Sequence, residues 1–189
     1  MTKNIMIVGV GGQGTLLASR ILGSVLTKEG YDVKLSEVHG MSQRGGSVVT
    51  YVRYGDRVDS PIIDRGGADV ILAFESLEAY RALPYLKKGG RMIANLQRID
   101  PMPVITGAAE YPEKIHEKLA AVCDLTSVDA AKIAREAGNL KAVNVALIGV
   151  LAAASEIPHD SFVDAITALV PPKFLEVNLR AFEAGYQLK

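Results

Sequence analysis

The sequence predicts an α/β protein: a three-layer, Rossmann-like domain with a mostly parallel, mixed sheet and a helical C-terminal part. Two observations lead to this class. Short apolar runs that suit buried strands alternate with helical patterns, which is typical of parallel sheets covered by helices. The runs at 5–8 and 33–38 each lead directly into a glycine-rich turn. We expect residues 1–189 to form a single domain, because a chain of this length buries most of its surface around one core.

The first half of the chain reads as strands with one long helix. Residues 5–8 predict a buried strand, residues 13–29 a helix that Gly30 ends, and residues 31–38 a second strand. Residues 4–38 therefore predict a strand–helix–strand unit, which normally joins parallel strands by a right-handed crossover. The alternating run 47–54, the turn Gly55-Asp56 and the short run 57–58 predict a hairpin, hence an antiparallel element.

The second half becomes progressively helical. Residues 69–74 predict a buried strand, 76–86 a helix and 91–96 another strand. The proline-containing segment 100–112 predicts a loop with one short strand. Helices are then predicted at 113–122, 130–137, 143–155, 160–169 and 173–186, with prolines separating the last three.

Composition excludes several functional classes. Lys plus Arg and Asp plus Glu both number 21, so no basic excess predicts binding to nucleic acid. The N-terminus lacks the pattern of a secretory signal, and the apolar stretch 142–154 is shorter than the ~20 residues that span a bilayer. We expect a cytoplasmic protein with no membrane partner. The single cysteine, Cys123, excludes an internal disulfide and cannot hold an iron–sulfur cluster alone.

The first glycine turn, 9–14, has the G-x-G-x-x-G spacing between a strand and a helix. Glycines there allow a tight turn and close approach of a phosphate to the backbone, and the helix N-terminus favours an anion. Glu37, at the end of the second strand, stands where dinucleotide folds keep their ribose-binding acid. The candidate binding residues of this turn are Gly9, Gly11, Gly12, Gln13 and Gly14.

Two other interpretations of this turn stay open. A free-standing NAD(P)- or FAD-binding protein has the same glycine spacing, but Gln13 and the second glycine turn after Glu37 count against it. Alternatively, the glycines only permit a tight connection and bind nothing, or the fold serves as an assembly surface.

The second glycine turn, 39–46, is rich in polar groups. Arg44 is a planar donor that suits a carboxylate or phosphate, and the ordinary pKa of a histidine, the residue type at position 39, lies near neutrality. Paired glycines let the backbone approach a ligand or another chain. The candidate residues of this turn are His39, Gln43, Arg44, Gly45 and Gly46.

Several segments together resemble a known family. GVGGQG at 9–14, SEVHGMSQRGGSV at 36–48, GADVILAFESLEAYRALPYLKKGG at 67–90 and PPKFLEVNLRAFEAG at 171–185 are similar to the gamma-type domain of 2-oxoacid:ferredoxin oxidoreductases. Within that family the pattern is nearest to the small subunit of the indolepyruvate-oxidising members. The resemblance spans essentially the whole chain, and its specific parts are Gln13 and the run HGMSQRGG at 39–46.

The resemblance implies a subunit that carries no cofactor of its own. Members of the family oxidatively decarboxylate 2-oxo acids with thiamine diphosphate, form acyl-CoA and reduce ferredoxin through iron–sulfur clusters. This chain has one cysteine and no GDG motif, so thiamine diphosphate, Mg and [4Fe-4S] clusters are expected on a large partner subunit. Ferredoxin is expected to act through that complex, and CoA is expected as its co-substrate. Whether the glycine turns contact CoA, the 2-oxo acid or the backbone of the partner subunit stays open.

The remaining candidates do not predict a catalytic or metal site. His116 and His159 stand without neighbouring ligand residues in the sequence, and Cys123 is interpreted as a packed residue rather than a nucleophile. Glu75 follows a buried strand, so it is predicted either to line the ligand crevice or to cap the next helix.

Overall fold

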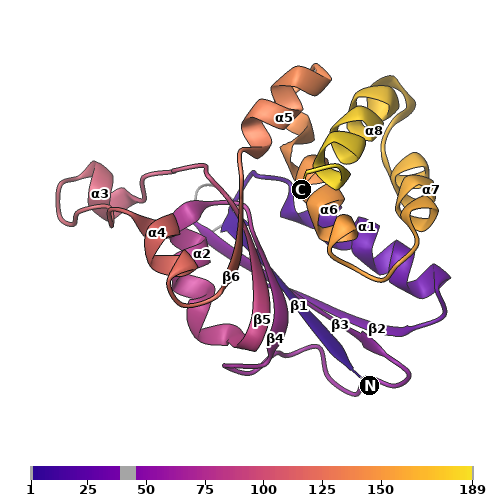
Figure 1. The fold of residues 1–189 in the computed structure, drawn as a ribbon, viewed down its shortest axis with the longest axis horizontal. Helices are drawn as coiled ribbons and strands as arrows, with labels where there is room; N and C mark the ends of the chain where they lie inside the picture. Colours follow the sequence, from indigo (N-terminus) through magenta and orange to yellow (C-terminus); the bar gives the residue numbers. More distant parts are fainter. Residues whose placement is uncertain (1, 39–45, 189) are drawn as a thin grey trace.

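The structure is a computed structural model that describes residues 2–38 and 46–188, and its architecture is three-layered (Figure 1). A six-stranded sheet has the order β2-β3-β1-β4-β5-β6. Its strands are β1 (Lys3–Val10), β2 (Asp32–Val38), β3 (Ser47–Gly55), β4 (Ala68–Ala73), β5 (Leu86–Asn95) and β6 (Asp124–Val128). β1, β4, β5 and β6 are parallel, whereas β3 is antiparallel to both β1 and β2. The prediction of a mixed, mostly parallel sheet is confirmed.

The helices divide between the two faces of the sheet (Figure 1). One face carries α1 (Thr15–Lys28), α6 (Val143–Ala153), α7 (His159–Leu169) and α8 (Pro172–Tyr186), with α5 (Ala130–Ala137) beside them. The other face carries α2 (Ser76–Ala82) and α4 (Ile115–Ala120). Short 3₁₀ turns at Leu83–Tyr85 and Leu140–Ala142 and a one-turn helix, α3 (Met102–Ile105), complete the fold.

Alternation along the central strands creates two separate cores. Ile5 and Ile7 of β1 point into a large core formed with α1, α6, α7 and α8, while Met6 and Val8 point into a small core formed with α2 and α4. Because both faces are covered, β1 reads as a continuous apolar run rather than an alternating one.

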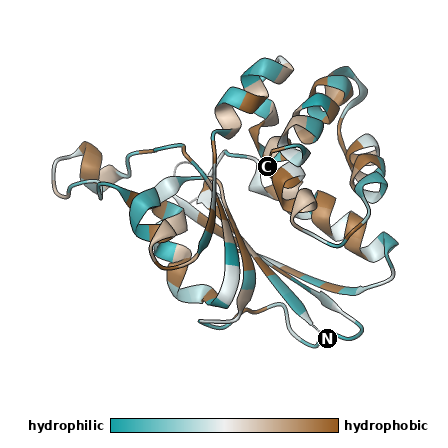
Figure 2. Ribbon diagram, viewed as in Figure 1, coloured by the Kyte–Doolittle hydropathy of each residue, from teal (hydrophilic) through white to brown (hydrophobic). Residues whose placement is uncertain are grey.

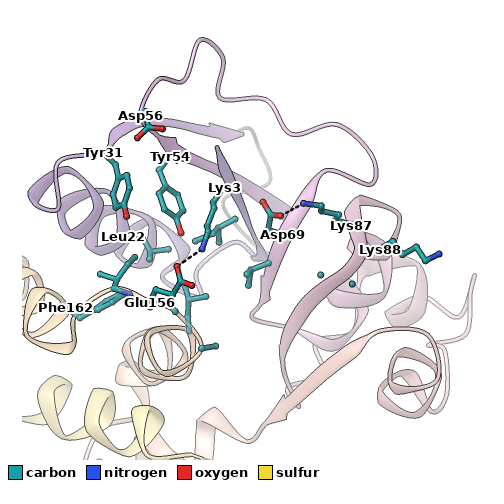
Figure 3. Close-up of a pocket in the computed structure, with 18 residues that line it drawn as sticks. Lys3, Leu22, Tyr31, Tyr54, Asp56, Asp69, Lys87, Lys88, Glu156 and Phe162 are labelled. Carbon is teal, nitrogen blue, oxygen red and sulfur yellow. Dashed lines mark hydrogen bonds and ion pairs between the residues drawn. The ribbon is translucent and has the colours of Figure 1, made fainter. Parts of the chain in front are cut away.

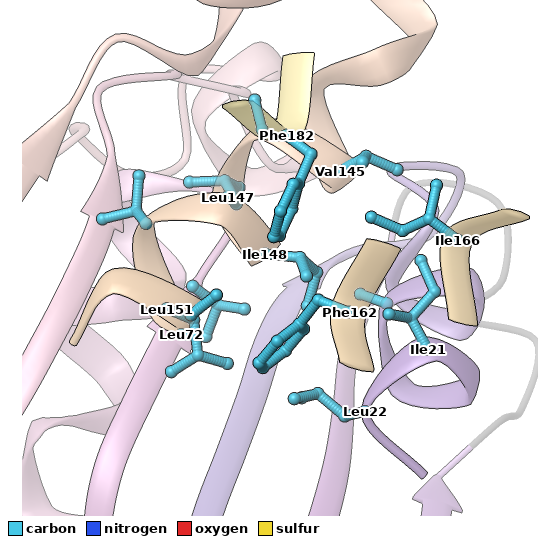
Figure 4. Close-up of a cluster of buried hydrophobic side chains, with 14 of the residues drawn as sticks. Ile21, Leu22, Leu72, Val145, Leu147, Ile148, Leu151, Phe162, Ile166 and Phe182 are labelled. Atoms are coloured by element: carbon cyan, nitrogen blue, oxygen red, sulfur yellow. The ribbon is translucent and has the colours of Figure 1, made fainter. Parts of the chain in front are cut away.

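The large core is built around α6. This helix is hydrophobic along most of its length (Figure 2), and its residues 144–152 are buried. Figure 4 shows side chains of α1, β4, α7 and α8 packed around it, among them Phe162 and Phe182. A helix that is apolar on every side is typical of a buried core helix. The prediction that this stretch is a core helix is therefore confirmed.

Four sequence predictions need correction. The run 57–58 is not a strand, so it does not form the predicted hairpin with residues 47–54. β3 is antiparallel, as predicted, but it pairs with β1 and β2. β3 also separates β1 from β2, which the strand–helix–strand unit does not reveal. The segment 100–112 contains α3 and no strand, and β6, a short edge strand, was missed.

The α2–β5 connection also differs from the prediction. α2 ends at Ala82 because Pro84 lies in the following 3₁₀ turn, and β5 begins at Leu86 rather than at residue 91. The pairing of β4 with β5 shifts register between Ala68 and Val70, so residues 87–90 bulge out of the ladder. Lys88-Gly89-Gly90 is therefore part of an irregular strand.

Two glycines set the distance between α6 and α8. A Cβ at Gly149 would lie 2.2 Å from the carbonyl oxygen of Phe182, and a Cβ at Gly185 would lie 2.1 Å from that of Ala146. Real Cβ atoms do not approach a backbone oxygen so closely, so the helices touch backbone to backbone. This contact brings the C-terminal helix against the core helix.

We predict that Gly185→Ala destabilises the protein by about 1–3 kcal/mol, because the added methyl group forces α6 and α8 apart. At an exposed helical glycine the same substitution would raise the free energy of unfolding, since alanine is the better helix former by about 1 kcal/mol. The measurement is the free energy of unfolding in urea. Ala184→Gly, at the exposed neighbouring position, is the control and is expected to lower stability by only about 1 kcal/mol. A stabilised Gly185→Ala variant would contradict the helix contact.

Candidate functional site

The first glycine turn lies at the carboxyl edge of the sheet, between β1 and α1. Gly12 and Gly14 have φ angles of 99° and 81°, which favour glycine, and Gly14 is the N-cap residue of α1 without a side-chain cap. A Cβ at Gly14 would also lie 2.6 Å from Nδ2 of Asn144, at the start of α6. The turn therefore needs glycine both for its conformation and for the approach of α6.

Gln13 holds this turn in place through both ends of its side-chain amide. Its Oε1 accepts a hydrogen bond from the backbone N–H of Val10 at 2.7 Å. Its Nε2 donates to the carbonyl of Phe74, just beyond β4, at 2.9 Å, and to Oε1 of Gln97 at 3.1 Å. A long polar residue before the last glycine is thus explained by the need to join the ends of β1 and β4.

The strands on either side of the second glycine turn reach the same edge of the sheet as the first turn. β2 ends at Val38 and β3 begins at Ser47, both at the edge where β1 ends. Gly11 donates its backbone N–H to the carbonyl oxygen of Gly46 at 2.9 Å. Of the candidate residues in this turn, Gly46 is therefore in contact with the first turn. His39, Gln43, Arg44 and Gly45 lie outside the described residues.

Two depressions flank the joined turns. One, of about 530 Å³, lies toward the start of α6 and is lined by Gly12, Gln13, Gly14, Gln97, Ala131, Leu140, Lys141, Val143 and Asn144. The other, of about 200 Å³, lies toward α2 and is lined by Val10, Gly46, Ser47, Glu75, Leu77, Glu78, Arg81, Ile99, Pro101 and Met102. The carboxyl edge therefore offers polar backbone and side chains on both sides of the turns.

Glu75 both caps a helix and lies at this edge. One carboxylate oxygen accepts a hydrogen bond from the N–H of Glu78 at 2.9 Å, which caps α2. The other accepts from the N–H of Ile99 at 3.0 Å and from the hydroxyl of Tyr111 at 2.6 Å. Burial and this carboxylate raise the pKa of Tyr111. The capping interpretation is thus confirmed, and Glu75, only 1% exposed, uses both oxygens within the protein.

Glu78 is a second buried carboxylate at this edge, and the sequence analysis missed it. It is bound by the hydroxyl of Ser47, at the start of β3, and by Arg81 at 2.7 Å. Its pairing with Ser47 ties α2 to the end of the second glycine turn. Its position in the first turn of a predicted helix was the available signal.

His116, His159 and Cys123 all make contacts within the part of the chain that the structure describes. Nε2 of His116 lies 3.0 Å from Oγ of Ser76, and its Nδ1 lies 2.8 Å from Oγ of Ser127; burial lowers the pKa of His116. The sequence analysis predicted that His159 has no neighbouring ligand residues. In the structure it contacts two carboxylates, those of Asp160 and Glu183.

The thiol of Cys123 donates to the carbonyl of Leu119 at 3.2 Å, packs against the small core, and has a pKa raised by burial. Among residues 2–38 and 46–188, no three His, Cys, Asp or Glu side chains are grouped so that they could hold a metal ion. In the same part of the chain, no helix has both the length and the apolar character needed to cross a membrane.

The inserted strand β3 counts against dinucleotide binding at the first turn. In a dinucleotide fold the strand after the first helix pairs directly with the first strand, so its terminal acid faces the ribose. Here β3 lies between them and moves β2 outward by one strand spacing, about 4.8 Å. Glu37 instead accepts a hydrogen bond from Ser19 of α1 at 2.5 Å.

Comparison with known proteins gives the family. The family described as Pyruvate ferredoxin/flavodoxin oxidoreductase matches residues 4–188. The chain belongs to this family. The indolepyruvate oxidoreductase subunits IorB of Thermococcus kodakarensis and Pyrococcus horikoshii are 46% and 45% identical to it; each comparison covers 96% of this chain and 93% of the relative. The resemblance that the sequence motifs indicated is therefore confirmed.

Solved structures show the same fold at lower identity. The pyruvate oxidoreductase subunit PORC of Thermotoga maritima superposes with a TM-score of 0.75 at 21% identity, over 98% of this chain and 95% of that one. A keto/oxoacid ferredoxin oxidoreductase gamma subunit from Geobacter sulfurreducens gives 0.73 at 22% identity, over 97% and 96%. In a 2-oxoglutarate:ferredoxin oxidoreductase from Magnetococcus marinus, the matching part is 30% of a longer chain. The family fold thus occurs both alone and within larger chains.

We predict that Gln13→Ala lowers the free energy of unfolding by about 1–3 kcal/mol, because it leaves the N–H of Val10 and the carbonyl of Phe74 without this partner. Chemical denaturation measures the change. Gln97→Ala is the matched control, since Gln97 is exposed, and it is expected to change stability by less than about 0.5 kcal/mol. Equal effects of the two substitutions would show that the Gln13 amide does not hold the turn.

We predict that His116 makes this family member less stable in acid. Burial lowers the pKa of His116 in the folded state, so the neutral imidazole is favoured by folding. The contribution of His116 to the free energy of unfolding is therefore complete above the unfolded pKa of about 6.5, and it is lost as the pH falls through the pKa of the folded state. The free energy of unfolding of His116→Gln should therefore fall less than that of the unmodified protein between about pH 7.5 and about pH 5.

His159→Gln provides a control of opposite sign. Hydrogen bonding to Asp160 raises the pKa of His159, so its contribution is present in acid and is lost as the pH rises through the folded value. Its replacement should steepen the loss of stability on acidification. Parallel pH profiles for the two variants would contradict both assignments.

Proposed function

We propose that this chain is the accessory subunit of a 2-oxoacid:ferredoxin oxidoreductase, with indolepyruvate as its substrate. The relatives that match over nearly their whole length are named indolepyruvate oxidoreductase subunits. The complex would oxidatively decarboxylate the 2-oxo acid, transfer the acyl group to CoA and pass two electrons to ferredoxin. The chain would act in the cytoplasm as one gamma-type domain and would have no activity alone.

The observation that carries this proposal is the contrast between an ordered polar sheet edge and the lack of cofactor ligands in the sequence. The two glycine turns are joined by the Gly11–Gly46 hydrogen bond and held by Gln13. Yet a cluster needs about four thiolates, and this chain has one cysteine, whose thiol is half-buried and bonded to a backbone carbonyl. The edge is therefore suited to serve chemistry located in another chain.

In this proposal the large partner subunit holds thiamine diphosphate, Mg and the [4Fe-4S] clusters. Bound thiamine diphosphate supplies the electron sink for decarboxylation. The residues of this chain would help to position and enclose the ligand. The turn backbone at Gly11, Gly12 and Gly46 would contact the partner subunit or the ligand. Gln13, whose amide is used internally, fixes the shape of that surface.

His39, Gln43 and Arg44 are proposed as the contacting side chains of the second turn. Arg44 suits an anionic group, and CoA carries phosphates that a guanidinium binds well. The solved structure of the Magnetococcus marinus enzyme is described with 2-oxoglutarate, coenzyme A and succinyl-CoA bound. CoA is therefore our first choice of ligand for this edge, with the 2-oxo acid and the partner backbone as the other two.

We predict that Arg44→Ala, tested in the complex co-expressed with its large subunit, weakens CoA or partner binding at least about 10-fold, because a charge-assisted hydrogen bond is lost. Initial rates at varied CoA and a titration of the purified subunits measure the two affinities. Arg65→Ala, an exposed arginine before β4 at the opposite edge of the sheet, is the control and should leave both unchanged. If Arg44→Ala alters neither affinity nor turnover, the proposed role of the second turn is wrong.

A further inference from the structure

An arm projects from the carboxyl edge of the sheet, between β5 and α4. It consists of residues 97–111 and carries the one-turn helix α3, which stands away from the sheet and from the other helices in Figure 1. Met102 and Ile105 lie three residues apart, and therefore on one face of α3, and they are 66% and 65% exposed. Figure 2 shows α3 as a hydrophobic segment. The arm thus presents an apolar surface that the described part of its own chain leaves uncovered.

The tip of the arm, residues 101–109, contains no charged side chain. Its sequence is PMPVITGAA, and most of these residues are exposed. Single apolar residues are common at a protein surface, but a contiguous apolar patch marks a contact with another molecule. The matching surface must itself be uncharged, because an apolar tip placed on a charged group would remove that charge from water. The tip therefore fits an apolar socket.

Hydrogen bonds within the tip hold its shape. The carbonyl of Pro101 accepts from the N–H of Ile105 at 3.1 Å, and the carbonyl of Pro103 accepts from the N–H of Ala108 at 2.8 Å. The rings of the two prolines also fix the backbone φ angles at those positions. The tip is therefore ordered by its own backbone, although its side chains are exposed.

The base of the arm is fastened to the body of the protein at both ends. The N–H of Ile99 and the hydroxyl of Tyr111 donate to the same carboxylate oxygen of the buried Glu75, at 3.0 and 2.6 Å. The guanidinium of Arg98 lies 4.2 Å from the centre of the Tyr111 ring and closes the base. A partner would meet a preformed surface, so little conformational entropy would be lost on binding.

The arm borders the joined glycine turns. The depression of about 200 Å³ at the carboxyl edge is lined by Gly46 and Ser47, where the second glycine turn ends. It is also lined by Pro101 and Met102 of the tip. A chain that covers the backbone of Gly46 would therefore meet Met102 as well. The apolar tip is continuous with the surface that the proposed function directs at the large subunit.

A cavity at the amino edge of the sheet does not match the tip. It has a volume of about 620 Å³ and is lined by the start of β1, the ends of β3 and α6, and the bulge of β5 (Figure 3). Its lining includes Tyr54 and six charged side chains. Lys3 is paired with Glu156 at 3.1 Å, and Asp69 is paired with Lys87 at 2.9 Å. An uncharged tip would separate these ion pairs from water.

The other hollows described above the helices and at the carboxyl edge are charged too. A groove of about 500 Å³ between α5 and α8 includes Glu136, Glu176 and Glu183 in its lining. The two depressions beside the glycine turns contain charged side chains, among them Glu78 and Lys141. A second copy of this chain therefore offers no uncharged socket at any of these places, so the socket belongs to a different chain.

We propose that residues 97–111 form a docking arm whose tip inserts into an apolar socket on the large partner subunit. The arm would add an apolar contact to the polar contact made by the glycine turns at the same edge of the sheet. The inference rests on the proposed function, because it specifies how the accessory subunit is held by that partner.

Titration calorimetry of the full chain with the purified large subunit tests the arm. Met102→Asp and Ile105→Asp each place a charge in the apolar contact and should weaken binding at least about 10-fold. Met102→Leu keeps an apolar side chain of similar volume and should keep the affinity within about 2-fold. Val122→Asp is the matched control. Val122 is 66% exposed, like Met102, but it precedes β6 at the amino edge, so its replacement should leave the affinity unchanged.

The outcomes separate the arm from the proposed function. If the unmodified chain binds the large subunit and both Asp variants of the tip bind equally well, the arm is wrong and the proposed function stands. If the unmodified chain does not bind the large subunit, both fail. Equal weakening by Val122→Asp would also overturn the arm, because any added charge would then have the same effect. Light scattering of the isolated chain tests the other occupant: a dimer that Met102→Asp dissociates would show that a second copy covers the tip, against the proposal.

Discussion

The side-chain amide of Gln13 joins the ends of the two central strands, and the geometry of the carboxyl edge depends on it. Through one amide the turn after β1 is bonded to its own strand and to the backbone just beyond β4. This leaves the N–H of Gly11 directed at Gly46, where the second glycine turn ends. Gln13 is half-buried, and displacing its amide would leave the N–H of Val10 and the carbonyl of Phe74 without this hydrogen-bond partner. The first turn is thus a fixed support against which the second can be placed.

The antiparallel strand β3 determines how this support differs from a dinucleotide site. By pairing with β1 along its whole length, it brings the second turn to the end of β1 and moves β2 to the outside of the sheet. The acid that ends β2 therefore lies one strand further from the first turn than in a dinucleotide fold. The same glycine spacing that binds a diphosphate elsewhere is here directed toward a neighbouring loop. Strand order, rather than the glycine motif, thus distinguishes this fold from a dinucleotide-binding fold.

The sequence was sufficient for features that depend on local patterns. The apolar runs of β1 and β4 and the wholly apolar α6 predicted buried elements, because burial on both sides requires such sequences. It was insufficient where tertiary pairing decides. Nothing in residues 47–54 shows that β3 pairs with β1 as well as β2, and β6 has few buried side chains to mark it. The glycine turns were located correctly, but the internal role of Gln13 depends on Phe74, which is far away in sequence. The cavity around Tyr54 joins residues from both ends of the chain and has no sequence motif at all.

The two edges of the sheet differ in chemistry for a structural reason. At the carboxyl edge β1 ends in a glycine turn, and the backbone of this turn lies beside neutral amides and charged side chains, among them Gln13, Asn144, Glu78 and Arg81. At the amino edge a cavity is lined by the bulge of β5 and by the side chains of Tyr54 and Lys3. The strands between are buried on both faces and closely packed, so they hold the two edges at a fixed separation. In the proposed assembly the carboxyl edge would face the catalytic partner, and the amino edge would lie away from that contact. Because the two surfaces share no side chain, either can change in evolution or by mutation without rebuilding the other.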